Sequence, residues 1–169
     1  GKTVSRIDSR FTGDSIKHIA DSSSYDPFFP AVGPAIIATF NDYYREQLGV
    51  KTDRKYITSG DLWRTWDERH EQPGAGLYGK LPVANTGVDL NYAMIQNPKM
   101  RVLVQQGYFD LACPYGATQY FLDHMDLPAE LRANLTAEYY PAGHMMYVHM
   151  PSLKDLQSNL VKFIDDSIS

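Results

Sequence analysis

The feature that most constrains this chain is a tight alternation of strand and helix patterns that begins after residue 98. Residues 101–106 form a run rich in β-branched residues, and an amphipathic helix is predicted to follow Pro114. Residues 135–140 predict a second strand, and an apolar stripe predicts a terminal helix that Ser152 caps. The order strand, helix, strand, helix is typical of a parallel sheet with helices on its faces. The sequence therefore predicts an α/β fold.

The preceding part of the chain, residues 1–98, is rich in loops and in Gly and Pro clusters. Residues 31–49 predict a helix, because apolar residues recur at helical spacing and a glycine follows as the stop. Residues 54–58 predict a short strand. The sequence Thr86-Gly-Val-Asp89 predicts a capping box that opens another helix, ending near residue 97. We therefore divide the chain into residues 1–98 and residues 99–169.

Composition excludes several classes of protein. Hydrophobic residues make up 43% of the chain, so we expect an ordered globular protein rather than a disordered one. The net charge of −4, with Lys and Arg scattered, argues against a nucleic-acid partner. No apolar stretch approaches the roughly 20 residues that span a bilayer, so we expect no membrane partner. The single cysteine, Cys113, cannot form a disulfide within the chain and does not decide the cellular compartment.

One acidic and one basic side chain follow the two predicted strands. Asp110 lies three residues after Gly107, and His144 lies three residues after Pro141. Because parallel strands place functional residues just beyond their carboxyl ends, we expect these side chains to meet at one edge of the sheet. A neutral imidazole is a suitable base near neutral pH, and a buried carboxylate fixes its tautomer. The pattern therefore predicts an acid–base pair, with a loop-capping Asp and a hydrogen-bonded His as the alternative.

The sequences around this pair carry a resemblance to a known family. They are Gly107-Tyr-Phe-Asp110-Leu-Ala-Cys113-Pro114 and Ala142-Gly143-His144-Met145-Met146-Tyr147. Both resemble, in order and in flanking residues, the Asp and His signatures of the serine carboxypeptidase family, which belongs to the α/β-hydrolase superfamily. Two further stretches resemble the bacterial branch of that family. They are the opening Val4-Ser-Arg6-Ile-Asp8-Ser-Arg10-Phe-Thr-Gly13 and the helix entry Asn85-Thr86-Gly87.

The resemblance implies a fold and an activity. Residues 99–169 would be the C-terminal portion of an α/β-hydrolase, and residues 1–98 a cap-like insertion with the approach to the sheet. The activity implied is removal of C-terminal residues from peptides through an acyl-serine intermediate, without a cofactor. Family membership is also compatible with a periplasmic or secreted location.

The resemblance further implies roles for four residues. Asp110 would orient the imidazole, and His144 would act first as general base and then as general acid. Cys113 would line the substrate cleft, and its alternative is a small buried hydrophobic residue. Met145 would help to form the leaving-group pocket, and its alternative is core packing.

One departure from the family pattern affects activity. The triad of α/β-hydrolases runs Ser…Asp…His, and its serine sits in Gly-x-Ser-x-Gly. Residues 1–109 contain no such motif. We therefore expect this chain to be inactive alone and to rely on an N-terminal portion of the same protein for the nucleophile. An unpaired sheet edge would also favour a homo-oligomer or a swapped dimer.

Two other sites are considered as alternatives. Gly13-Asp14-Ser15-Ile16 echoes the nucleophile block of another hydrolase group, but no strand is predicted before it and no Asp-x-x-His surrounds His144. A tract rich in His and Met suggests a soft metal, but its two histidines, His144 and His149, stand five apart. We therefore expect no metal site.

A third alternative is a non-catalytic module that keeps a hydrolase-like fold for binding. In that case Trp63, Trp66 and Tyr78 would form its recognition surface.

Overall fold

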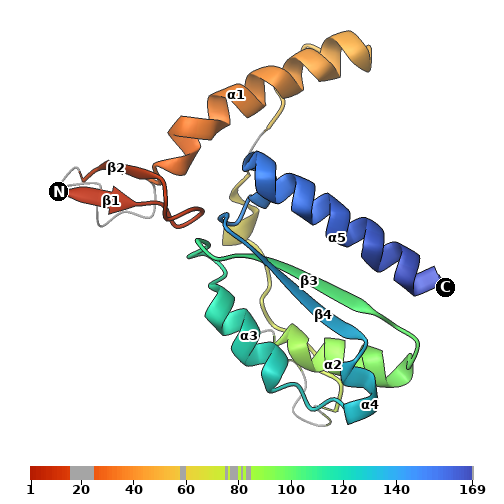
Figure 1. The fold of residues 1–169 in the computed structure, drawn as a ribbon. Coiled ribbons are helices and arrows are strands. Elements are labelled where there is room, and N and C mark those ends of the chain that lie inside the picture. Colours follow the sequence, from red (N-terminus) through yellow and green to blue (C-terminus); the bar gives the residue numbers. More distant parts are fainter. Residues whose placement is uncertain are drawn as a thin grey trace. The chain divides into compact units, whose positions relative to one another are not determined.

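The computed structural model describes the chain in two compact units (Figure 1). The described residues are 1–15, 25–57, 60–74, 76, 80, 82 and 85–168, without the side chains of residues 61 and 63. The first unit comprises Gly1–Ser5 and Phe11–Asp67, and the second comprises Arg6–Arg10 and Glu68–Ser169. The division therefore falls after residue 67 rather than after residue 98, because the helix that ends near residue 97 packs into the core of the second unit.

The first unit contains a short β-ribbon and a long helix. Strand β1 (Lys2–Val4) pairs antiparallel with strand β2 (Thr12–Asp14). Helix α1 (Phe28–Asp42) continues into the π-helical turn η1 (Tyr43–Gln47), and Gly49 follows with a φ of 64°. The predicted helix is therefore confirmed, although it begins earlier, where the Asp26 carboxylate accepts a hydrogen bond from the first helical N–H.

The rest of the first unit is irregular apart from the 3₁₀ turn η2 (Asp61–Arg64). The strand predicted over residues 54–58 is wrong for residues 54–57, and residue 58 lies outside the described residues. No described strand pairs with residues 54–57, and Ile57 is 74% exposed.

The second unit is built on a parallel pair of strands. Strand β3 (Val102–Gly107) pairs with strand β4 (Leu135–Tyr140) in a register that joins Val102 to Leu135 and Gly107 to Tyr140. Helices α3 (Tyr115–Asp123) and α4 (Ala129–Arg132) connect the two strands, and helix α5 (Met150–Ile168) follows β4. The predicted strand–helix–strand–helix order and the parallel pairing are therefore confirmed, and the fold class is α/β.

Helices cover both faces of the β3–β4 pair (Figure 1). On one face, alternate strand residues pack against a core supplied by helix α2 (Thr86–Gln96), α3 and α4. The buried members of this core are Met94, Leu122, Met125, Leu127 and Leu131. The other face carries α5, and Leu103 and Phe163 line a small cavity between them. Helices on both faces are the usual surroundings of a parallel pair of strands.

Helix α2 is capped differently from the sequence prediction. Its N-cap is Asn85, whose side chain accepts a hydrogen bond from the Gly87 N–H at 3.3 Å. Asp89 does not close a capping box but pairs with His70, whose Nε2 lies 2.8 Å from a carboxylate oxygen. The Asp89 carboxylate, which the local pattern predicts as part of the cap, is therefore bonded to His70 instead.

Helix α5 begins two residues before its predicted cap. Ser152 is fully buried inside the first turn, and its hydroxyl is hydrogen-bonded to Nδ1 of His149 at 2.7 Å. The capping prediction for Ser152 is therefore wrong, because Met150 and Pro151 already have helical structure.

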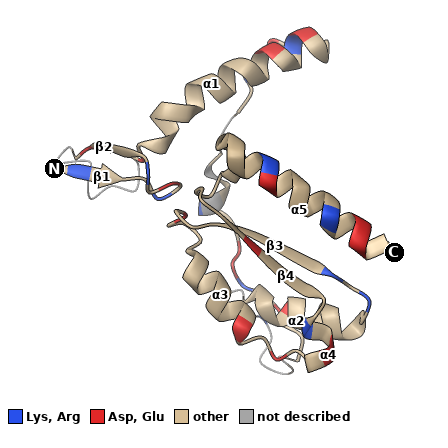
Figure 2. Ribbon diagram, viewed as in Figure 1, with Lys and Arg blue, Asp and Glu red and all other residues tan. Residues whose placement is uncertain are grey.

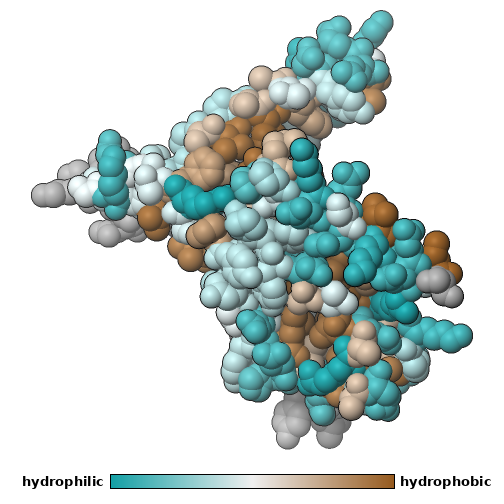
Figure 3. All heavy atoms as spheres, in the orientation of Figure 1, coloured by the Kyte–Doolittle hydropathy of each residue, from teal (hydrophilic) through white to brown (hydrophobic). Residues whose placement is uncertain are grey.

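The surface of the described residues shows mixed charge and some exposed apolar groups. Basic and acidic residues, all of them Lys or Asp, alternate along α5 (Figure 2), and apolar side chains are exposed along α1 (Figure 3). Those on α1 include Phe29, Ile36 and Ile37, each more than 40% exposed. Within the described residues, no helix is both long enough and apolar enough to cross a membrane.

Candidate active site

The two strands of the second unit deliver Asp110 and His144 to the same edge of the sheet. Beyond the ends of β3 and β4, the chain continues as two loops that remain bonded to each other. The Tyr108 N–H donates to the carbonyl oxygen of Tyr140, and the Phe109 N–H donates to that of Ala142, both at 2.9 Å. The residues that follow these bonds, Asp110 and His144, therefore lie face to face, as the sequence predicted.

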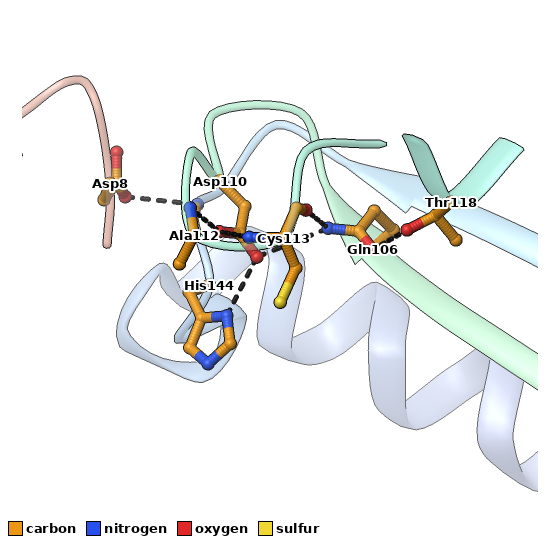
Figure 4. A network of polar contacts seen from close by, with 8 residues as sticks. Asp8, Gln106, Asp110, Ala112, Cys113, Thr118 and His144 are labelled. Atoms are coloured by element: carbon orange, nitrogen blue, oxygen red, sulfur yellow. Dashed lines mark hydrogen bonds and ion pairs between the residues drawn. The ribbon is translucent and has the colours of Figure 1, made fainter. Parts of the chain in front are cut away.

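A hydrogen bond joins the two side chains. Nδ1 of His144 lies 2.9 Å from Oδ2 of Asp110. The aspartate side chain is 3% exposed and the histidine side chain is 46% exposed. In Figure 4 the imidazole points Nδ1 toward the carboxylate, while Nε2 faces away from it. Because a carboxylate accepts hydrogen bonds, Nδ1 donates in this bond, and in the neutral imidazole Nε2 then carries the lone pair.

The Asp110 carboxylate is held by further donors from its own loop. Its Oδ1 accepts hydrogen bonds from the N–H groups of Ala112 and Cys113, each at 2.8 Å. Hydrogen bonds from two backbone N–H groups fix the orientation of a carboxylate. A buried carboxylate with these partners is suited to orient an imidazole and to stabilise an imidazolium.

Gln106 is a site residue that the sequence reading missed. It lies on β3, is 8% exposed, and donates through Nε2 to the Cys113 carbonyl at 2.6 Å and to Oδ2 of Asp110 at 3.3 Å. Its Oε1 accepts a hydrogen bond from the Thr118 hydroxyl at 2.9 Å (Figure 4). The available signal was a pair of amide residues, Gln105 and Gln106, at the end of an otherwise apolar strand.

The structure separates the two alternatives for Cys113. Cys113 is exposed and has a free thiol, so the interpretation as a small buried hydrophobic residue is wrong. Its exposure beside the pair is compatible with a position in a cleft. Met145 is half-buried, which leaves its two interpretations open.

Three side chains at this edge offer donor atoms to a metal. Ligand atoms of Asp110, Cys113 and His144 all lie within 4.8 Å of one another. Carboxylate, thiolate and imidazole are the ligand types that zinc takes. However, the carboxylate already accepts four hydrogen bonds, one of them from His144, so a metal would have to displace the bond that defines the pair.

The other sites considered from the sequence have different surroundings. A strand does precede Ser15, contrary to the sequence prediction, but β2 belongs to an antiparallel ribbon, and the Ser15 N–H donates to the Gly1 carbonyl. His144 and His149 bond to different partners, Asp110 and Ser152.

The proposed aromatic recognition surface is described only in part. Trp66 is 69% exposed, whereas the side chain of Trp63 and the whole of Tyr78 lie outside the described residues.

Comparison with protein-family models, with curated proteins and with solved structures found no match. The function of this chain is therefore inferred from the geometry of the site. That geometry is a buried, fully hydrogen-bonded carboxylate that orients an exposed imidazole at the carboxyl ends of two parallel strands.

Proposed function

We propose that this chain supplies the acid and base of a serine-type carboxypeptidase, on the C-terminal portion of an α/β-hydrolase fold. The observation that carries the proposal is the 2.9 Å hydrogen bond between Nδ1 of His144 and the buried Asp110 carboxylate. The same two residues lie in the sequences that resemble the family signatures. An exposed Nε2 opposite this bond is the atom that a catalytic base must present to its substrate.

In the proposed reaction, His144 moves one proton in each half of the cycle. Nε2 accepts the proton of a serine hydroxyl as the oxygen attacks the peptide carbonyl, and the Asp110 carboxylate stabilises the imidazolium. The imidazolium then donates that proton to the leaving amine, which departs as the acyl-serine ester forms. Water hydrolyses the ester with His144 again as the base. The steps need no cofactor.

The serine comes from outside residues 1–169, which contain no Gly-x-Ser-x-Gly. We assign it to an N-terminal portion of the same protein. Within the described residues, β3 and β4 pair only with each other, so each strand has one edge left for a further strand. A two-stranded sheet is rarely stable by itself, which supports association with that portion or with a second copy of the chain.

The first test uses the reading frame directly before the codon for Gly1. We expect it to encode Gly-x-Ser-x-Gly between a strand and a helix pattern. The protein with this segment should release C-terminal residues from blocked dipeptides. Asp110→Asn should lower kcat roughly 10⁴-fold and His144→Ala roughly 10⁶-fold, as expected for loss of the orienting carboxylate and of the base. His149→Ala is the matched control and should leave kcat unchanged, because His149 bonds to Ser152 instead.

Three results would contradict the proposal in whole or in part. Absence of the motif from the upstream frame would favour the non-catalytic binding module. Equal kcat values for the His144→Ala and His149→Ala proteins would remove His144 from the chemistry. The chain of 169 residues alone should show no turnover, and turnover that His144→Ala abolishes would show that the nucleophile lies within this chain.

A further inference from the structure

The segment Arg6–Arg10 is bonded to both loops of the candidate site, although it lies more than 95 residues before them in the sequence. Toward the loop of Asp110, one carbonyl of the segment accepts a hydrogen bond and one N–H donates a hydrogen bond. Toward the loop of His144, one carbonyl and one carboxylate oxygen of the segment each accept a hydrogen bond from a backbone N–H. The four bonds are Leu111 N–H to Arg6 O (3.0 Å), Ser9 N–H to Phe109 O (2.9 Å), His144 N–H to Ile7 O (2.7 Å) and Gly143 N–H to Asp8 Oδ2 (3.1 Å). We call this segment the clasp.

The centre of the clasp is an ion pair between the buried Asp8 and Arg10, whose side chain is 32% exposed. Asp8 is 1% exposed, and the guanidinium of Arg10 binds both of its carboxylate oxygens, at 2.6 and 2.9 Å. Burial acts to raise the pKa of Asp8. The Arg10 guanidinium and backbone N–H groups outweigh this effect, so the pKa lies below its ordinary value and the carboxylate stays charged.

Arg10 itself reaches both loops. Its Nη1 donates to the Pro141 carbonyl at 2.6 Å, and its guanidinium lies 5.1 Å from the centre of the Phe109 ring. Phe109 precedes Asp110, and Pro141 is three residues before His144. A planar guanidinium can make this set of contacts, whereas the point charge of lysine cannot.

The loop of His144 also packs directly on Asp8. A Cβ atom added to Gly143 would lie 2.5 Å from the Ile7 carbonyl oxygen and 2.6 Å from Cγ of Asp8. Separations under 3.0 Å are essentially never found for Cβ atoms. Only glycine therefore allows the backbone next to His144 to approach the clasp this closely.

We propose that Asp8 and Arg10 are positioning residues for the Asp110–His144 pair. The imidazole is about half exposed, and its orientation depends on where the two loops hold the backbones of Asp110 and His144. A hydrogen bond of 2.9 Å is lost when its atoms separate by several tenths of an ångström more. The clasp ties both loops to one ion pair, centred on the buried Asp8, and so keeps the two side chains within bonding distance. The catalytic importance of this role rests on the proposed function, whereas the positioning itself does not.

The test follows the imidazole N–H protons of the chain by NMR, where a hydrogen bond to a carboxylate protects the proton from exchange with water. The pair His70–Asp89 serves as an internal reference, because it is a second His–carboxylate bond in the same compact unit. The Asp110→Asn variant identifies the NMR signal of the His144 Nδ1 proton, because that variant removes the carboxylate to which this proton is bonded. The test variants are Asp8→Asn and Arg10→Lys, and Asp14→Asn is the matched control, since Asp14 is exposed and pairs with Lys2.

We expect both test variants to raise the exchange rate of the His144 Nδ1 proton roughly tenfold or more, as loss of a well-placed charged partner predicts. The His70 proton should exchange at its original rate, and Asp14→Asn should change neither. Unchanged exchange at His144 would overturn the proposal. A parallel increase at both histidines would also overturn it, because it would show a general loss of structure.

Two further points keep the test decisive. If Asp8→Asn does not fold, Arg10→Lys decides alone, since it keeps the positive charge beside Asp8 and removes the contacts that only a planar guanidinium makes with Asp8, Pro141 and Phe109. If the unmodified chain shows no protected His144 proton, the acid–base pair of the proposed function fails. If that proton is protected but insensitive to both variants, only the positioning role fails.

Discussion

Replacing Gly107 with alanine should strongly disturb the candidate site. Gly107 is the last residue of β3, where the two loops diverge from the sheet. An added Cβ would lie 2.8 Å from the carbonyl carbon of Ala142, and closer still to the carbonyl oxygens of Ala142 and Gly143. All three obstacles are backbone atoms, so no side-chain rotation relieves the overlap.

The size of the effect follows from the displacement required. An ordinary contact begins near 3.4 Å, so the loop of His144 must move by at least 0.6 Å. The same movement would lengthen the bond from His144 to Asp110, now 2.9 Å, toward the limit of hydrogen bonding. We expect Gly107→Ala to lower the free energy of unfolding by about 3 kcal/mol, at the upper end of the usual cost of overpacking. For a chain of this length this corresponds to a Tm lower by roughly 6–12 °C.

Gly116→Ala is the matched control. Gly116 lies in α3, and an added Cβ would meet nothing within 4 Å. Since alanine is the better helix former, this variant should gain about 0.5–1 kcal/mol. Urea unfolding followed by circular dichroism measures both variants. A loss below 1 kcal/mol for Gly107→Ala would refute the argument, because the two strand ends would then not be in close contact.

Three more predictions concern stability and are measured by urea unfolding. The pKa of Asp8 is lower in the folded chain than in the unfolded chain, where it is about 4. The ionised Asp8 therefore contributes its full stabilisation above pH about 4, and this contribution is lost as the pH falls through the pKa of the folded chain. Asp8→Asn should make the free energy of unfolding depend less on pH in this acid range. Met94→Ala should cost about 2–5 kcal/mol because Met94 is 1% exposed, whereas Met150→Ala, at 60% exposure, should cost less than about 0.5 kcal/mol. Asn85→Ala should cost about 1 kcal/mol by removing the cap of α2, and a larger cost for Thr86→Ala would contradict the cap assignment.

The sequence by itself determined the local elements of the second unit and their order. Apolar runs bounded by Gly and Pro predicted β3 and β4, and helical periodicity predicted α3 and α5. Asp110 and His144 were also predictable, because residues that follow parallel strands share one edge of the sheet whatever the details of packing. Short-range patterns of this kind are properties of neighbouring residues and can be read directly.

Only the tertiary structure decided which partners complete the site. The clasp bonds to residues up to 135 positions away, and no local pattern indicates that Asp8 accepts a hydrogen bond from Gly143. The role of Gln106 depends on the turn that brings Cys113 back to β3, and Asp89 pairs with His70 rather than with its own helix. These contacts arise because buried polar groups must find partners wherever the folded chain places them, and the positions of those partners are set by packing between distant segments.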